Sequence, residues 1–83
     1  MLIVVIGEAC RIRIQNLCKA KGITLNKLAL MSGVTQSTLN NIISGRNNSA
    51  TVSTIKKLCD GLDLSIIEFF SDDIFLSLEQ EIK

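Results

Sequence analysis

Apolar residues recur along this chain at spacings of three and four, which is the pattern of short amphipathic helices. Five stretches with this spacing follow one another, at residues 9–20, 25–31, 35–43, 51–60 and 65–70. A sixth places four apolar residues on one side of a last amphipathic helix: Ile74, Phe75, Leu78 and Ile82. No Pro interrupts these stretches, so the pattern predicts an all-α bundle.

Small polar residues and glycines mark the ends of the predicted helices. Side-chain oxygens of Ser and Thr cap helix N-termini, and the S-x-x-E spacing forms a capping box. The candidate caps are Thr24, Thr35, Ser49 or Thr51, and the Ser65/Glu68 pair. Four glycines each follow a helical stretch and are expected in the left-handed conformation just past its end: Gly22, Gly33, Gly45 and Gly61.

The first residues, MLIVVI, form the one strand-like piece of the chain. A lone strand leaves its backbone polar groups unpaired. Three outcomes remain open: a disordered or loosely docked segment, which we favour, a strand paired with another chain, or an extension of the first helix. The run is too short for a membrane helix, and it lacks the basic region and cleavage site of a signal peptide. We therefore expect a cytoplasmic protein with residues 1–8 as an apolar N-terminal extension.

Charge is distributed unevenly, although the formal net charge of the 83 residues is only +1. The span from Ala9 to Cys59 holds eight of the nine basic residues and none of the eight acids. A positive field over such a length suits a polyanion such as DNA. The alternative is a solvated surface whose charges happen to segregate along the chain.

The sequence indicates neither a metal site nor a catalytic site. It contains no His, and its three cysteines form no paired motif, whereas structural zinc usually takes four Cys or His ligands. Cys10, Cys18 and Cys59 are interpreted as small core residues, with a redox switch as the alternative. General acid–base chemistry has few candidates. We expect no enzyme activity, no cofactor, no metal and no small-molecule substrate.

The most informative segment joins the second and third predicted helices. Ala29 is small enough for another helix to cross closely, Gly33 suits the turn, and Val34 fixes the angle. Leu39 and Ile42 then hold the third helix on the core. The residues left to face outward carry no charge: Thr35, Gln36, Ser37, Thr38, Asn40 and Asn41. A solvated helix face normally uses Glu, Lys and Ala, so this composition favours contact with a partner.

With these residues the sequence resembles the Cro and lambda-repressor-like helix-turn-helix proteins, the XRE family. The resemblance covers about Arg11 to Phe70, and its most specific part is TLNKLALMSGVTQSTLNNIISGR. The segment IKKLCDGLDLSIIEFF is similar to the family's fourth and fifth helices. The resemblance implies a compact five-helix DNA-binding bundle over residues 9–70, with the helix-turn-helix at about 25–44. An additional short C-terminal helix is expected in the acidic segment 71–83.

The resemblance also implies which residues contact DNA. The family's third helix enters the major groove, which assigns base contacts to Gln36, Ser37, Thr38, Asn40 and Asn41. Phosphate contacts are implied for Lys27, Thr35, Arg46, Asn47 and Asn48. One departure is Leu25, because family members often carry Gln there to touch a phosphate. Asn26 or Thr24 substitutes for that contact, or the contact is missing.

A homodimer is expected because one short helix offers too few base contacts for useful specificity. The predicted interface lies in the acidic segment, with Phe70, Phe75, Leu78 and Ile82 as anchors. The predicted function is that of a sequence-specific regulator of transcription that binds double-stranded operator DNA, more often as a repressor. The rival is a protein-interaction module on the same fold, antitoxin-like or an adaptor, which would use the N-terminal and C-terminal apolar residues.

Overall fold

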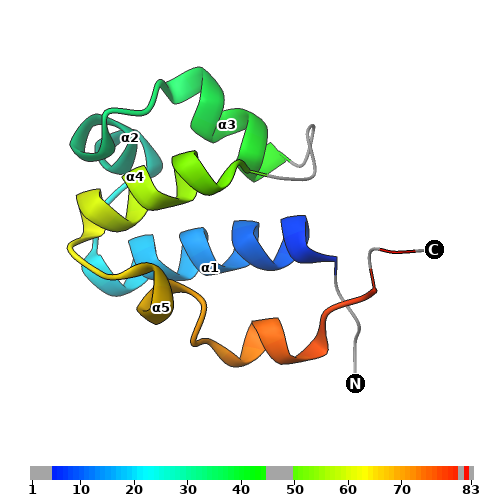
Figure 1. The fold of residues 1–83 in the computed structure, drawn as a ribbon. Helices are drawn as coiled ribbons and strands as arrows, with labels where there is room; N and C mark the ends of the chain where they lie inside the picture. The colour runs from blue at the N-terminus through cyan, green and yellow to red at the C-terminus, as the bar shows by residue number, and fades with distance from the viewer. Residues whose placement is uncertain (1–4, 45–49, 81, 83) are drawn as a thin grey trace.

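A computed structural model describes residues 5–44, 50–80 and 82, and its regular elements are helices (Figure 1). Their order is α1 Ile6–Lys21, α2 Leu25–Ser32, α3 Gln36–Ser44, α4 Val52–Leu62, α5 Ile66–Phe69 and the 3-10 helix η1 Asp73–Ser77. This bundle of five α-helices with a short additional helix near the C-terminus confirms the predicted fold class.

Side-chain caps start the helices where the sequence predicts them. Thr24, Thr51 and Ser65 are N-caps whose side chains accept the backbone N–H three residues further on. Thr35 does the same at the start of α3, at 3.1 Å. Glu68 completes the capping box, and hydrogen bonds from Ser65 lower the pKa of its carboxyl below the ordinary value of 4.5. Each cap satisfies a backbone donor that has no partner inside its helix.

Two of the predicted left-handed glycines are confirmed, and one prediction is wrong. Gly22 and Gly33 end α1 and α2 with φ of 66° and 67°. Gly61 instead lies inside α4, which ends at Asp63 with φ of 59°. The physical reason for Gly61 is proximity: a Cβ there would overlap the Ser32 Oγ and lie 3.1 Å from the Ser32 Cα. This glycine therefore allows α4 to approach α2 closely.

The first helix starts earlier than residue 9. It begins at Ile6 after Val5, which is extended and contributes no side-chain cap. Ile6 packs against the core, and Glu8 forms an ion pair with Arg11. The favoured expectation of a loose segment is therefore wrong for Ile6–Glu8, where helix extension holds; residues 1–4 lie outside the described part.

One apolar face from each α-helix contributes to a single core. Its buried members are Cys10, Ile14, Leu17, Cys18, Leu28, Ala29, Leu39, Ile42, Ile55, Leu58, Cys59, Leu62 and Phe69. α2 packs against α4 and α3, while α1 contacts α2, α3 and η1. Figure 1 shows η1 (orange) beside α1 (blue), with α2 and α3 together at the opposite side of the bundle. This packing presents α3 at the surface of the molecule.

The last helix is shorter than the apolar spacing predicts. Asp72 starts η1 by accepting the Ile74 N–H at 2.9 Å, but the helix ends at Ser77 and Leu78 is extended. Ile82 is 83% exposed. An amphipathic helix continuing to Ile82 is thus wrong, because the backbone leaves the helical region at Leu78, where φ is −77° and ψ is 139°.

Arg13 of α1 binds the C-terminal segment through hydrogen bonds. Its guanidinium donates to the carbonyl oxygens of Phe69 at 2.8 Å and Glu68 at 2.9 Å, and to the Asp72 carboxylate at 3.2 Å. A cation at the end of α5 satisfies carbonyls that lack intrahelical partners. This member of the basic span therefore has a structural role.

Candidate nucleic-acid interface

The turn between α2 and α3 has the geometry that the sequence predicts. Gly33 is left-handed, and the N–H of Val34 donates to the Ala29 carbonyl at 3.1 Å. Val34 packs partly buried against the core, and Leu39 is 1% exposed. Ile42 is also buried on the same side of α3. These residues fix the angle of α3 and turn its other side outward.

The outward side of α3 forms a shallow hollow of about 420 Å³. Its lining residues are Gln36, Ser37, Asn40, Asn41 and Ser44. Four of the five predicted base-contacting residues are therefore brought together. Thr38 is the exception and does not line the hollow. Its N–H donates to the Thr35 Oγ1 at 3.1 Å, and its hydroxyl accepts from the same atom at 2.8 Å.

Ser44 is the lining residue that the sequence analysis missed. Its hydroxyl donates to the Asn41 carbonyl at 3.2 Å. The signal was present in the sequence, since Gln36, Asn40 and Ser44 follow one another at intervals of four and so share one side of a helix. The prediction stopped at Asn41 because the helix was expected to end near Ile43.

The hollow contains only uncharged hydrogen-bonding groups. Side chains of Gln36, Ser37, Asn40 and Asn41 make no hydrogen bond to any other residue that the structure describes. Amide side chains offer both donors and an acceptor, and hydroxyls offer one donor and two acceptors. These groups match base edges in the major groove, and none of them titrates near neutral pH. The face can thus form directional hydrogen bonds to a partner.

The predicted phosphate contacts are only partly within the described chain. Lys27 is exposed on α2, and its backbone N–H is capped by Thr24 at 3.1 Å. The Thr35 hydroxyl is exposed but already serves the start of α3. Residues 45–49 lie outside the described residues, and they include Gly45, Arg46, Asn47 and Asn48. The phosphate roles of these residues stay predictions.

In the folded protein, several basic side chains of the basic span form ion pairs with acidic side chains. Three ion pairs occur among the described residues: Arg11 with Glu8, Arg13 with Asp72, and Lys56 with Asp60. Four further lysines have no carboxylate within 4.0 Å in the same part of the chain: Lys19, Lys21, Lys27 and Lys57. The available positive charge is therefore smaller than the sequence alone indicates, because acids at both edges of the span fold back onto it.

The predicted dimer anchors differ in how far they are exposed. Phe70 and Phe75 pack against each other with ring centroids 4.9 Å apart, and both contact the buried Phe69. Leu78 is 38% exposed and Ile82 is 83% exposed. Leu76, which the sequence analysis did not select, is 82% exposed. Phe75 therefore packs on the core, whereas Phe70, itself 38% exposed, belongs with Leu76, Leu78 and Ile82 to the exposed apolar surface.

The cysteines lie where the core interpretation predicts. Cys10, Cys18 and Cys59 are free and buried, and burial raises the pKa of each thiol. A raised pKa lowers the thiolate fraction and disfavours the redox alternative. The described residues contain no group of three or more His, Cys, Asp or Glu that could hold a metal ion. Nor do they contain a helix long and apolar enough to cross a membrane.

Comparison with known proteins gives the family. A family model described as Helix-turn-helix matches residues 14–69, which is more than half of the chain. The crystal structure of the prophage Lp1 protein 11 is similar, with a TM-score of 0.77 and 31% sequence identity over 84% of this chain and 92% of that chain. No curated protein matches the sequence. The chain therefore belongs to the XRE-type helix-turn-helix family of DNA-binding regulators.

Proposed function

We propose that this protein is a sequence-specific regulator that binds a duplex DNA operator as a homodimer and represses transcription by occupying it. The observation that carries the proposal is the outward side of α3, where Gln36, Ser37, Asn40 and Asn41 share one hollow without described hydrogen-bond partners. The major groove is about 12 Å wide and admits an α-helix. Unpaired amides and hydroxyls on such a helix suit base edges.

Each side chain has a role in this proposal. Gln36 is the first residue of α3, and the N-terminal residues of such a helix contact bases in this type of fold. Its amide, like that of Asn40, can bind adenine through one donor and one acceptor. Lys27, with the predicted phosphate ligands Thr35, Arg46, Asn47 and Asn48, would position α3 by contacting the backbone.

The decisive experiment selects bound fragments from random duplex DNA and then measures affinity across a salt series. We expect Gln36→Ala to weaken operator binding by about 1–3 kcal/mol and to relax one base position. Lys27→Ala should weaken all duplexes similarly and make the salt dependence shallower by about one phosphate contact. Gln80→Ala, at an exposed glutamine outside α3, is the matched control for Gln36→Ala and should leave affinity unchanged.

Two results count against the proposal at different levels. Absence of duplex binding at low salt would exclude the regulator function. Equal losses for operator and random DNA in Gln36→Ala would exclude Gln36 as a base contact while leaving DNA binding intact.

A second candidate function is a protein-interaction module on the same fold, antitoxin-like or an adaptor. The exposed aliphatic side chains favour it, since Ile67 and Leu76 are each 82% exposed and Ile82 is 83% exposed. Such a module would show little salt-dependent affinity for duplex DNA, so the same salt series separates the two candidates.

A further inference from the structure

A stripe of polar side chains runs along one side of α1. Glu8, Arg11, Gln15 and Lys19 follow one another at intervals of three, four and four, which places them on the same helix face. The Arg11 guanidinium is held by the Glu8 carboxylate and donates to the Gln15 Oε1 at 3.5 Å. Because its oxygen faces Arg11, Gln15 has its amide nitrogen left as a donor.

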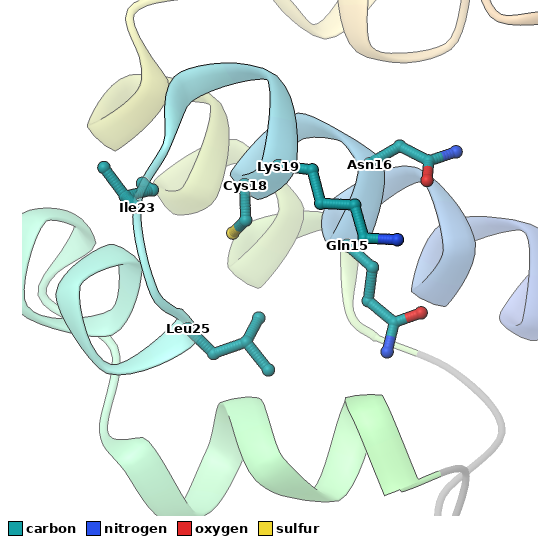
Figure 2. A pocket seen from close by; sticks show the side chains of 6 residues that line it. All are labelled: Gln15, Asn16, Cys18, Lys19, Ile23 and Leu25. Atoms are coloured by element: carbon teal, nitrogen blue, oxygen red, sulfur yellow. The ribbon is translucent and has the colours of Figure 1, made fainter.

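This stripe ends at a second hollow of about 300 Å³ between α1 and the start of α2. Its lining residues are Gln15, Asn16, Cys18, Lys19, Ile23 and Leu25 (Figure 2). In Figure 2 the Gln15 nitrogen points toward the side along which α3 passes, and the Lys19 ammonium lies on the same side of α1. Leu25 faces them from α2.

The charge of the hollow favours an anion. No carboxylate lines it, and Lys19 has no acidic partner within 4.0 Å in the described chain. The side chain of Leu25, the first residue of α2, has no donor, so the polar side chains of the hollow come from α1. An ammonium group and an amide N–H next to one another suit an oxyanion such as a phosphate.

The position of the hollow indicates which phosphate. α1 and α3 are in contact, so an anion held at this edge of α1 lies beside the helix that carries the base-contacting face. When a helix occupies the major groove, backbone phosphates pass along its flanks. We propose that Gln15 and Lys19 bind a backbone phosphate of duplex DNA from α1. This inference rests on the proposed function and adds to it a contact from outside the helix-turn-helix.

The test compares two lysines in the last turn of α1. Lys19→Gln should lower affinity about three- to tenfold for operator and random duplex alike, and should reduce the slope of log K against log salt by about one unit. Lys21→Gln makes the same charge change outside the hollow and should leave the slope nearly unchanged. Gln15→Leu keeps the side-chain size but removes the donor, so it should lower affinity without altering the slope.

The outcomes separate this inference from the proposed function. If the wild-type protein binds duplex and Gln36→Ala weakens it, while Lys19→Gln and Lys21→Gln behave alike, the α1 phosphate contact is wrong and the regulator stands. If the wild-type protein binds no duplex at low salt, both fail. Amide shifts of Gln15 and Lys19 that saturate with millimolar inorganic phosphate, but do not respond to duplex, would also overturn the inference.

Discussion

Where α4 passes α2, Gly61 faces Ser32 with no space for a side chain. A Cβ at Gly61 would overlap the Ser32 Oγ and lie 3.1 Å from both the Cα and the Cβ of Ser32. The same approach buries the Ser32 hydroxyl, which finds no hydrogen-bond partner in the described chain. A buried unpaired hydroxyl costs about 1–3 kcal/mol. Close packing of two helices is therefore achieved here at the expense of one polar group.

We expect Gly61→Ala to lower the free energy of unfolding by about 1 kcal/mol, since overpacking costs more than the gain in helix propensity returns. Urea unfolding followed by circular dichroism measures the change. Adding Ser32→Ala removes the overlapped hydroxyl, so the double variant should recover most of the loss. A Gly61→Ala variant as stable as the wild-type protein would show that this approach does not need a glycine.

Gly61 also shows where single residues mislead a sequence-based prediction. A glycine that ends a helix and a glycine that admits a neighbouring helix look the same in the sequence. Gly33 is of the first kind and Gly61 of the second, and only packing against Ser32 distinguishes them. Asp63 ends α4 in the left-handed conformation because a short polar side chain tolerates it.

At the scale of elements, what could be predicted depends on how far each determinant acts along the chain. Caps act over three residues, so the starts of α2, α3, α4 and α5 were predictable from Thr24, Thr35, Thr51 and Ser65. The uncharged polar side of α3 was predictable too, because one helix carries all of it; its contact with DNA bases stays a prediction. By contrast, the hydrogen bond from Arg13 to the Phe69 carbonyl spans 56 residues, and the hollow beside Gln15 needs two helices to form. Neither leaves a periodic signal in the sequence.

The Arg13 contact leads to a prediction about the C-terminal segment. Arg13→Ala should lower the free energy of unfolding by about 1–3 kcal/mol, because it removes the described donor of the Phe69 carbonyl. The Glu68 carbonyl and the Asp72 carboxylate each lose one hydrogen bond but keep donors from Ser71 and Ile74. Amides of η1 should exchange with solvent faster, relative to those of α3, than in the wild-type protein. Arg11→Ala removes a more exposed ion pair from the same helix and should cost about 0–1 kcal/mol. Equal small losses for the two variants would contradict the assigned role of Arg13.

For the whole molecule, the separation of charge along the sequence becomes a mixed surface in space. Asp72 of the acidic segment forms an ion pair with Arg13 of α1. Glu8 and Asp60 form ion pairs with basic side chains one helical turn away. What remains for DNA is a smaller set of lysines and a neutral polar helix face. This balance agrees with the proposed function, in which hydrogen bonds from α3 provide the specificity.

Dimer formation is the prediction that involves the entire molecule. We expect Leu78→Glu combined with Ile82→Glu to convert a sedimenting dimer into a monomer, because charges would replace two exposed apolar side chains of the proposed dimer interface. Operator affinity should fall while affinity for an isolated half-site is retained, since α3 is untouched. Ile67→Glu changes an equally accessible side chain on α5, 82% exposed, and should leave the dimer intact. A wild-type protein that sediments as a monomer, both at high concentration and on operator DNA, would defeat the dimer.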